Sequence, residues 1–87
     1  MTFSVIARRS AQKFLNDLRD DDHQRVEEKI KSLALDPFPR EVVRVMGRSG
    51  EKIFRVRVGH YRILYIVDFD QKQVVIDSID KRPRAYD

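Results

Sequence analysis

Three arginines in the second half of the chain have the type and spacing needed to hold a phosphate. Arg55 and Arg57 are separated by a single residue, and Arg62 follows shortly after them. Each guanidinium group presents a planar fork of N–H donors that fits two oxygens of a phosphate. The pattern predicts an anion-binding site, provided that the fold brings the three side chains together.

The residues around the arginines predict a β-hairpin. Residues 52–58 and 61–67 are rich in β-branched and aromatic side chains, and the Gly-His pair between them fits a two-residue turn with glycine in the positive-φ position. In that register Arg57 lies directly opposite Arg62, with the third arginine on the diagonal. Like charges opposite one another destabilise a sheet, so we interpret the cluster as a site that an anion neutralises.

Alternate residues of the hairpin form one continuous apolar surface, which predicts that this face packs against the rest of the chain. The residues on it are Phe54, Val56, Val58, Tyr61, Ile63, Tyr65 and Val67. The opposite face carries the arginines together with the apolar side chains of Ile53, Leu64 and Ile66. A helix or strand of a partner could bury this second, mixed surface.

The remaining elements predict a two-layer α+β domain. Apolar residues recur at helical spacing over residues 7–18 and 20–35, and three aspartates at the start of the second segment can cap it. Short strand-like segments cover residues 3–6, 41–46 and 74–79. The order is β-α-α-β-β-β-β, and two amphipathic helices can cover only one face of a sheet of this size. The face with the arginines is therefore expected to stay open.

Length and composition predict one small domain that spans residues 1–87. Of the 87 residues, 41% are hydrophobic and 37% are charged, which suits a soluble domain with an ordinary core. No apolar run approaches the roughly 20 residues needed to span a bilayer, and the N-terminus does not read as a signal peptide. The lack of cysteine excludes disulfides, thiolate metal sites and a cysteine nucleophile. We therefore expect a cytoplasmic protein that makes no contact with a membrane.

The net charge of +4 belongs entirely to the half of the chain that reads as β-sheet. Residues 1–39 hold seven basic and seven acidic side chains, whereas residues 40–87 hold eleven basic and seven acidic ones. Basic charge concentrated on one element favours an anionic polymer or an acidic partner. A solubilising surface bias is the alternative interpretation.

The C-terminal tail contains a second basic cluster. Lys81, Arg82 and Arg84 follow the last predicted strand, and Tyr86 lies just beyond them. Arginine forks suit phosphate oxygens, and a phenol can stack on a base or donate a proton. A solvated chain end without a specific role is the alternative.

The other polar residues offer little catalytic chemistry. His23 lies near the start of the second predicted helix and is interpreted as a surface residue. His60 lies in the hairpin turn, where proton transfer is the alternative to a purely structural role. The sequence contains no glycine-rich phosphate loop, no spacing typical of metal ligands and no carboxylate pair that suggests an acid–base couple. No metal or cofactor is expected.

Over nearly its whole length the chain resembles the RelE side of the RelE/ParE superfamily of toxins from toxin–antitoxin systems. The resemblance rests on the order of elements, on the hairpin motif at residues 54–65, and on Lys81-Arg82 followed closely by Tyr86. It implies a two-layer fold with a mostly antiparallel sheet in which the first strand lies beside the last. Within the superfamily, Arg82 and Tyr86 favour the RNA-cleaving branch over the branch that acts on DNA gyrase.

The same resemblance implies a reaction and roles for individual residues. RelE-type toxins cleave mRNA on the ribosome without a metal: the ribose 2′-hydroxyl attacks its own 3′-phosphate and leaves a 2′,3′-cyclic phosphate and a 5′-hydroxyl. By position, Arg62 matches the arginine that clamps the phosphate, Arg82 the arginine on the leaving-group side, and Tyr86 the tyrosine that stacks on a base or handles a proton. Arg55 and Arg57 match two basic residues of the catalytic strand. The phosphate-binding candidates are Lys52, Arg55, Arg57, Arg62, Lys81 and Arg84.

Two features depart from the family pattern. Arg55 and Arg57 stand where the best-known bacterial members carry lysines, one of which is the usual candidate for the general base. Because arginine stays protonated, its contribution would be electrostatic, and the base would be water, Tyr86, Lys81 or His60. Lys81 also stands where many relatives carry a histidine.

The resemblance also implies partners. A RelB-like antitoxin is expected to contact Ile53, Leu64 and Ile66 and to neutralise the arginines, while the ribosome and mRNA are the targets of the free toxin. Two alternatives stay open at this point. One is a non-catalytic, ParE-like toxin that acts on DNA gyrase, and the other is a simple RNA-binding module.

Overall fold

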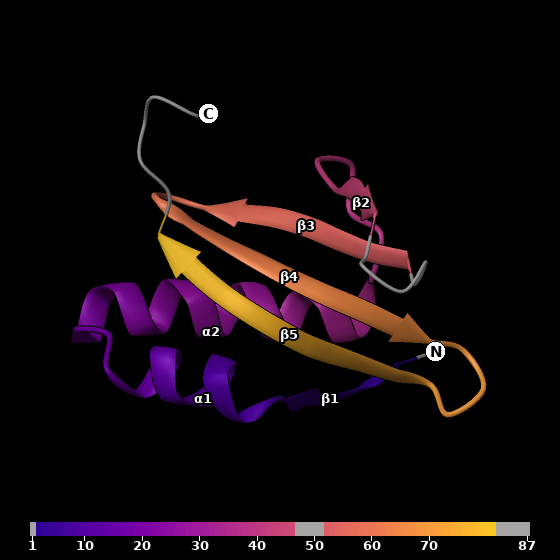
Figure 1. Cartoon of the computed structure of the whole chain (residues 1–87), viewed down its shortest axis with the longest axis horizontal. Helices are drawn as coiled ribbons and strands as arrows, with labels where there is room; N and C mark the ends of the chain where they lie inside the picture. Colours follow the sequence, from indigo (N-terminus) through magenta and orange to yellow (C-terminus); the bar gives the residue numbers. More distant parts are fainter. Residues whose placement is uncertain (1, 47–51, 82–87) are drawn as a thin grey trace.

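The computed structural model describes residues 2–46 and 52–81, which form two layers. Figure 1 shows both helices on the same side of a five-stranded sheet. The elements are, in chain order, β1 (Ser4–Ala7), α1 (Arg9–Asn16), α2 (Asp20–Leu35), β2 (Val43–Met46), β3 (Lys52–Val58), β4 (Tyr61–Asp68) and β5 (Gln73–Lys81). The predicted order of elements and the α+β class are confirmed.

The sheet has the strand order β1-β5-β4-β3-β2. β1 runs parallel to β5, and every other neighbouring pair is antiparallel. The first strand therefore lies beside the last, as the resemblance implied, and the two helices form the crossover between β1 and the antiparallel strands. The helices thus lead from β1 at one edge of the sheet to β2 at the other edge, and β5 returns to pair with β1 only after the three antiparallel strands.

The core lies between the helices and one face of the sheet. Ala11 and Leu15 project from α1 and three apolar residues from α2, at the spacing that places them on one side of each helix. They meet the apolar face of the hairpin and of β5. The fully buried large side chains are Val26, Leu33, Val56, Ile63, Tyr65, Val74 and Ile76. Among the described residues, this packing covers one face of the sheet and leaves the other open.

The hairpin adopts the predicted register. Val58 pairs with Tyr61 across a two-residue turn, and Phe54 pairs with Tyr65 at the far end. Gly59 has a φ of 59°, a conformation that L side chains rarely adopt. The sequence signal of glycine between two strand-like segments thus identified both the turn and the face on which each side chain lies.

The start of α2 differs from the expectation that an aspartate caps it. Arg19 is the N-cap residue and makes no side-chain capping hydrogen bond, while Asp20, Asp21 and Asp22 lie inside the first turn. Their charges still favour the positive end of the helix dipole. In addition, the hydroxyl of Tyr61 donates to Oδ2 of Asp22 at 2.8 Å, which fixes the start of the helix to the hairpin.

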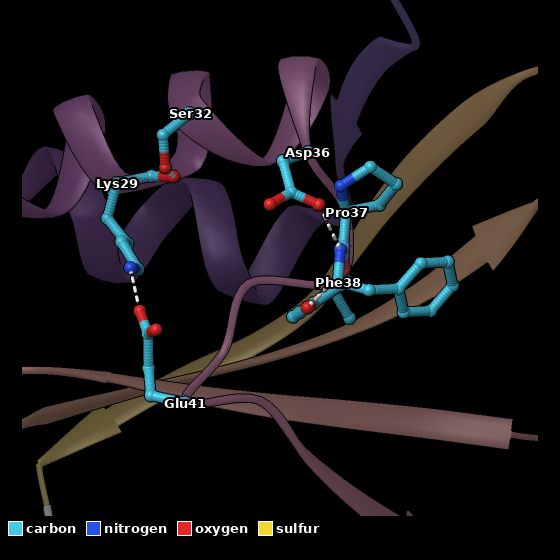
Figure 2. Close-up of polar contacts among 7 residues, drawn as sticks. Lys29, Ser32, Asp36, Pro37, Phe38 and Glu41 are labelled. Atoms are coloured by element: carbon cyan, nitrogen blue, oxygen red, sulfur yellow. Dashed lines mark hydrogen bonds and ion pairs between the residues drawn. The ribbon is translucent and has the colours of Figure 1, made fainter.

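The connection from α2 to β2 is held by polar contacts, which Figure 2 shows. The backbone N–H of Phe38 donates to Oδ1 of Asp36 at 3.1 Å, and the side chain of Lys29 forms an ion pair with Glu41. The Lys29 contact lowers the pKa of Glu41 below its ordinary value. β2 begins at Val43 and not at Glu41 as expected, since Glu41 faces α2 instead of joining the ladder.

A β-bulge interrupts the pairing of β4 with β5. Tyr65 pairs with Ile76, but Leu64 pairs with Ser78, so Asp77 is the additional residue on β5. After the bulge, Ile79 lies in the core and Asp80 lies on the open face. If every residue of β5 paired regularly and no bulge formed, these two side chains would exchange faces.

Candidate nucleic-acid interface

The three arginines of the hairpin lie on the face of the sheet that the helices leave open. Arg57 is the register partner of Arg62, as the sequence predicted, and Arg55 is the partner of Leu64 further along the same ladder. Arg57 is exposed, whereas Arg55 and Arg62 are half-buried among their neighbours. The expected gathering of the arginines on one face is confirmed.

Asp80 neutralises Arg62 within the protein. The carboxylate lies on β5 as the register partner of Arg62, and it accepts two hydrogen bonds of 2.9 Å, from Nε to Oδ1 and from Nη2 to Oδ2. The expectation that an external anion offsets all three arginines is therefore wrong for Arg62. The bulge is the physical reason, since it turns an acidic side chain onto the face that carries the arginines.

The charged side chains form a row across three strands. Asp80 on β5, Arg62 on β4 and Arg57 on β3 are successive register partners. A bidentate arginine–carboxylate pair is among the stronger polar contacts in proteins. This row therefore carries a net charge of about +1 in place of the +2 of its two arginines, and Arg55 adds positive charge beside it.

Both predicted phosphate-binding lysines lie on the other face. Lys81 is the register partner of Tyr61, whose hydroxyl contacts α2, so the alternation of β5 directs Lys81 toward the helix side. Lys52 has the same alternation as Phe54, which belongs to the core layer. The structure does not bring either lysine together with the arginines. Three further predicted residues, Arg82, Arg84 and Tyr86, lie outside the described residues.

A row of apolar side chains also crosses the open face. Ile66 pairs with Val75, and Val75 in turn pairs with Ile6 of β1. On the β3 side of Ile66, continuation of the hairpin register places Ile53 opposite it, and Ile53 in turn pairs with Val45 of β2. These residues form an apolar row across all five strands, with Leu64 beside it. The sequence identified Ile53, Leu64 and Ile66, but the contributions of Ile6, Val45 and Val75 require the pairing of distant strands.

The hairpin turn places two titratable side chains at the end of the arginine row. His60 is exposed in the turn, and Tyr61 follows it on the helix side. The hydrogen bond to Asp22, with smaller contributions from burial and from the charge of that carboxylate, raises the pKa of Tyr61 above its ordinary value. Tyr61 therefore stays a protonated donor and is a poor candidate for a base.

The arrangement can bind and polarise a phosphate group electrostatically. Arg55 and Arg57 supply fixed positive charge on an accessible strand surface, and such charge stabilises a phosphate that gains negative charge during a reaction. Within residues 2–46 and 52–81, no helix has the length and apolar character needed to cross a membrane.

Comparison with known proteins agrees with this geometry. Residues 5–86 match the family model of the ParE toxin of the type II toxin–antitoxin system parDE. The chain is 31% identical to a putative toxin RelE1 of Methanocaldococcus jannaschii, over 99% of this chain and 97% of that protein.

Solved structures lead to the same family. RelE in the archaeal RelE–RelB complex from Pyrococcus horikoshii superposes with a TM-score of 0.82 at 31% identity, covering 97% of this chain and 99% of that one. The RelBE2 toxin–antitoxin complex from Mycobacterium tuberculosis matches with a TM-score of 0.80 at 26% identity, covering 94% of this chain and 100% of that one. The chain therefore belongs to the RelE/ParE superfamily and is a RelE-family toxin of a type II toxin–antitoxin system.

Proposed function

We propose that this toxin is a ribosome-dependent mRNA endoribonuclease that inhibits translation. The observation that carries the proposal is the presence of Arg55, Arg57 and Arg62 together on the sheet face opposite α1 and α2, the helices of the described part of the chain. Membership of the RelE family and the basic tail after β5 support it. The ribosome supplies the mRNA in an extended form in its decoding site.

The proposed reaction needs no group other than the RNA's own hydroxyl as the nucleophile. The ribose 2′-hydroxyl attacks the adjacent phosphorus, the bond to the 5′-oxygen of the next nucleotide breaks, and the products are a 2′,3′-cyclic phosphate and a 5′-hydroxyl. The protein's contribution is in-line positioning and stabilisation of the negative charge that develops on the phosphate. Arg55 and Arg57 are suited to this electrostatic role because a guanidinium stays protonated.

The remaining proposed roles follow the resemblance. Arg62 contacts the scissile phosphate, Arg82 the leaving-group side, and Tyr86 a base or a transferred proton. Neither strand arginine can accept a proton readily, so the base is water, Tyr86 or His60. His60 fits this role best among the described residues, since it lies in an exposed turn next to the Arg57–Arg62 pair.

The cognate partner of the toxin is proposed to be a RelB-like antitoxin. The P. horikoshii and M. tuberculosis relatives were solved as complexes with their antitoxins. In this chain the apolar row through Ile53, Leu64 and Ile66 offers surface for a partner helix or strand, and the neighbouring arginines attract acidic side chains. An antitoxin bound there would exclude RNA from the same face.

The test is to induce the toxin without its antitoxin and to map the 5′ ends of cellular transcripts. We expect new 5′-hydroxyl ends at codon-defined positions within translated frames, and translating ribosomes should be required in a purified system. Arg57→Gln and Arg82→Gln should remove the cuts, whereas Arg9→Gln on the outer surface of α1 is a matched control that should not. Intact mRNA in the presence of wild-type toxin and ribosomes would refute the proposal.

A second candidate function is action on DNA gyrase. The family model that matches residues 5–86 is described as the ParE toxin, which favours this candidate. It predicts a DNA-damage response on induction, with intact transcripts and no effect of Arg82→Gln. Measuring the damage response and the transcript ends in the same induced culture separates the two functions.

A further inference from the structure

We propose that Asp80 is an internal competitor of RNA, a carboxylate that occupies Arg62 and thereby lowers the affinity of the open face for phosphate. The inference rests on the proposed RNA-binding function of this face and adds a residue that limits it. The sequence patterns of the arginines and of the tail do not predict a role for Asp80, because its position opposite Arg62 depends on the register of β5.

The geometry of the pair matches the way in which arginine holds a phosphate. Nε and Nη2 of Arg62 form one edge of the guanidinium fork, and both donate to Asp80 at 2.9 Å. A phosphate would use the same edge to form two parallel charge-assisted hydrogen bonds. The carboxylate must therefore move away before a phosphate can take this edge of Arg62.

The exposure of the two side chains favours competition over simple support. The side chain of Asp80 is 43% exposed and that of Arg62 is 15% exposed. A polyanion that approaches the row meets the carboxylate before the arginine, and the charge of the carboxylate repels it. The half-exposed position also leaves Asp80 room to turn toward solvent when a phosphate replaces it.

A purely structural role for Asp80 makes a different prediction. Asp80 offsets the repulsion between Arg57 and Arg62, so its removal would lower stability under either interpretation. Only competition predicts that the same removal strengthens RNA binding and that this gain depends on Arg62. RNA affinity is thus the readout that separates the two roles.

The experiment measures binding of a fluorescein-labelled single-stranded RNA oligonucleotide to the purified chain by anisotropy, over a series of NaCl concentrations. Asp80→Asn should bind about tenfold more tightly than wild type, the factor expected for one added charge-assisted hydrogen bond. The slope of log K against log salt should become steeper by about 0.7, which corresponds to one more phosphate contact on a single strand. Asp80→Ser provides a second neutral variant should the asparagine variant fail to fold.

Asp77→Asn is the matched control, since Asp77 lies on the same strand and pairs with Arg8 instead of Arg62. It removes the same charge, and we expect no change in the salt slope. In an Arg62→Gln background, Asp80→Asn should give no gain. The inference is overturned if Asp80→Asn binds no more tightly than Asp77→Asn, or if its gain persists without Arg62.

Cleavage of ribosome-bound mRNA by the wild type is measured in parallel, so that the two proposals can fail separately. A gain in binding with Asp80→Asn but no cleavage by wild type would support the competition and refute the nuclease. Cleavage by wild type with unchanged binding by Asp80→Asn would support the nuclease and overturn the competition.

Discussion

Removal of a single hydroxyl group in the core should reveal how strongly the α2–β2 connection is tied to the sheet. Tyr65 is 0% exposed, and its hydroxyl donates to the backbone oxygen of Pro37 at 2.6 Å. Tyr65→Phe keeps the ring and its contact with Phe54, whose ring centroid lies 5.9 Å away. The substitution therefore removes the hydrogen bond and leaves the packing nearly unchanged.

The expected loss follows from the burial of both partners. Pro37 is itself buried, so water cannot readily replace the lost donor at its carbonyl oxygen. Leaving a buried acceptor unsatisfied costs about 1–3 kcal/mol of the free energy of unfolding. For a domain of this size about 2 kcal/mol corresponds to a drop in Tm of roughly 8–16 °C.

Urea denaturation and thermal melting of wild type and variant measure this loss. Tyr61→Phe is the matched control, because it also removes one tyrosine hydroxyl, but this hydroxyl donates to the partly exposed Asp22. That variant should lose only about 0.5–1 kcal/mol, since water can solvate the carboxylate. If Tyr65→Phe loses no more than Tyr61→Phe, the burial argument is refuted.

The pH dependence offers a further check on the same pair of variants. Burial, followed by the charges of Asp36 and Glu41, raises the pKa of the Tyr65 hydroxyl above its ordinary value of about 10. Because this pKa is raised, the contribution of the Tyr65 hydroxyl to the free energy of unfolding is fully present below the ordinary tyrosine pKa and is lost only as the pH rises beyond that value. The stability difference between wild type and Tyr65→Phe should therefore be constant from about pH 6 to pH 9.

Three other predictions concern the turn, an ion pair and the open face. Gly59→Ala should destabilise the hairpin by about 1–2 kcal/mol. An added Cβ meets no atom, so the cost comes from the φ of 59°, which L side chains rarely adopt. An unchanged urea midpoint would contradict this. Lys29 lowers the pKa of Glu41, so the ion pair stabilises the fold at pH values above the ordinary glutamate pKa. This stabilisation is lost as the pH falls through the lowered pKa. Glu41→Gln should therefore narrow the difference in urea midpoint between pH 7 and pH 3. Ile66→Glu should weaken binding of the cognate antitoxin at least tenfold, or about 1.4 kcal/mol, as measured by calorimetry, and should leave the Tm of the toxin unchanged. An undiminished affinity would show that the antitoxin binds elsewhere.

Local patterns were sufficient to predict the hairpin and its two faces. The alternation of apolar and polar residues around Gly59 fixed which side chains are buried and which lie on the open face. The spacing of apolar residues likewise predicted both helices to within a few residues. These features depend on contacts between neighbours in the sequence, and the residue types alone carry the signal.

The capping of α2 and the start of β2 were predicted less well. In both places a polar side chain contacts another element: Asp22 accepts a hydrogen bond from Tyr61, and Glu41 forms an ion pair with Lys29. These partners lie on other elements, so the sequence around each residue contains no sign of them.

The residue types and their alternation around Gly59 are sufficient to assign the chemistry of the open face, because they place arginines there whatever the rest of the chain does. The net charge of that face, in contrast, depends on how distant strands pair. The additional residue at Asp77 reverses the alternation of β5 and sets Asp80 against Arg62. A bulge arises from the fit of one strand to its neighbours across the sheet, so the local sequence of β5 does not predict it.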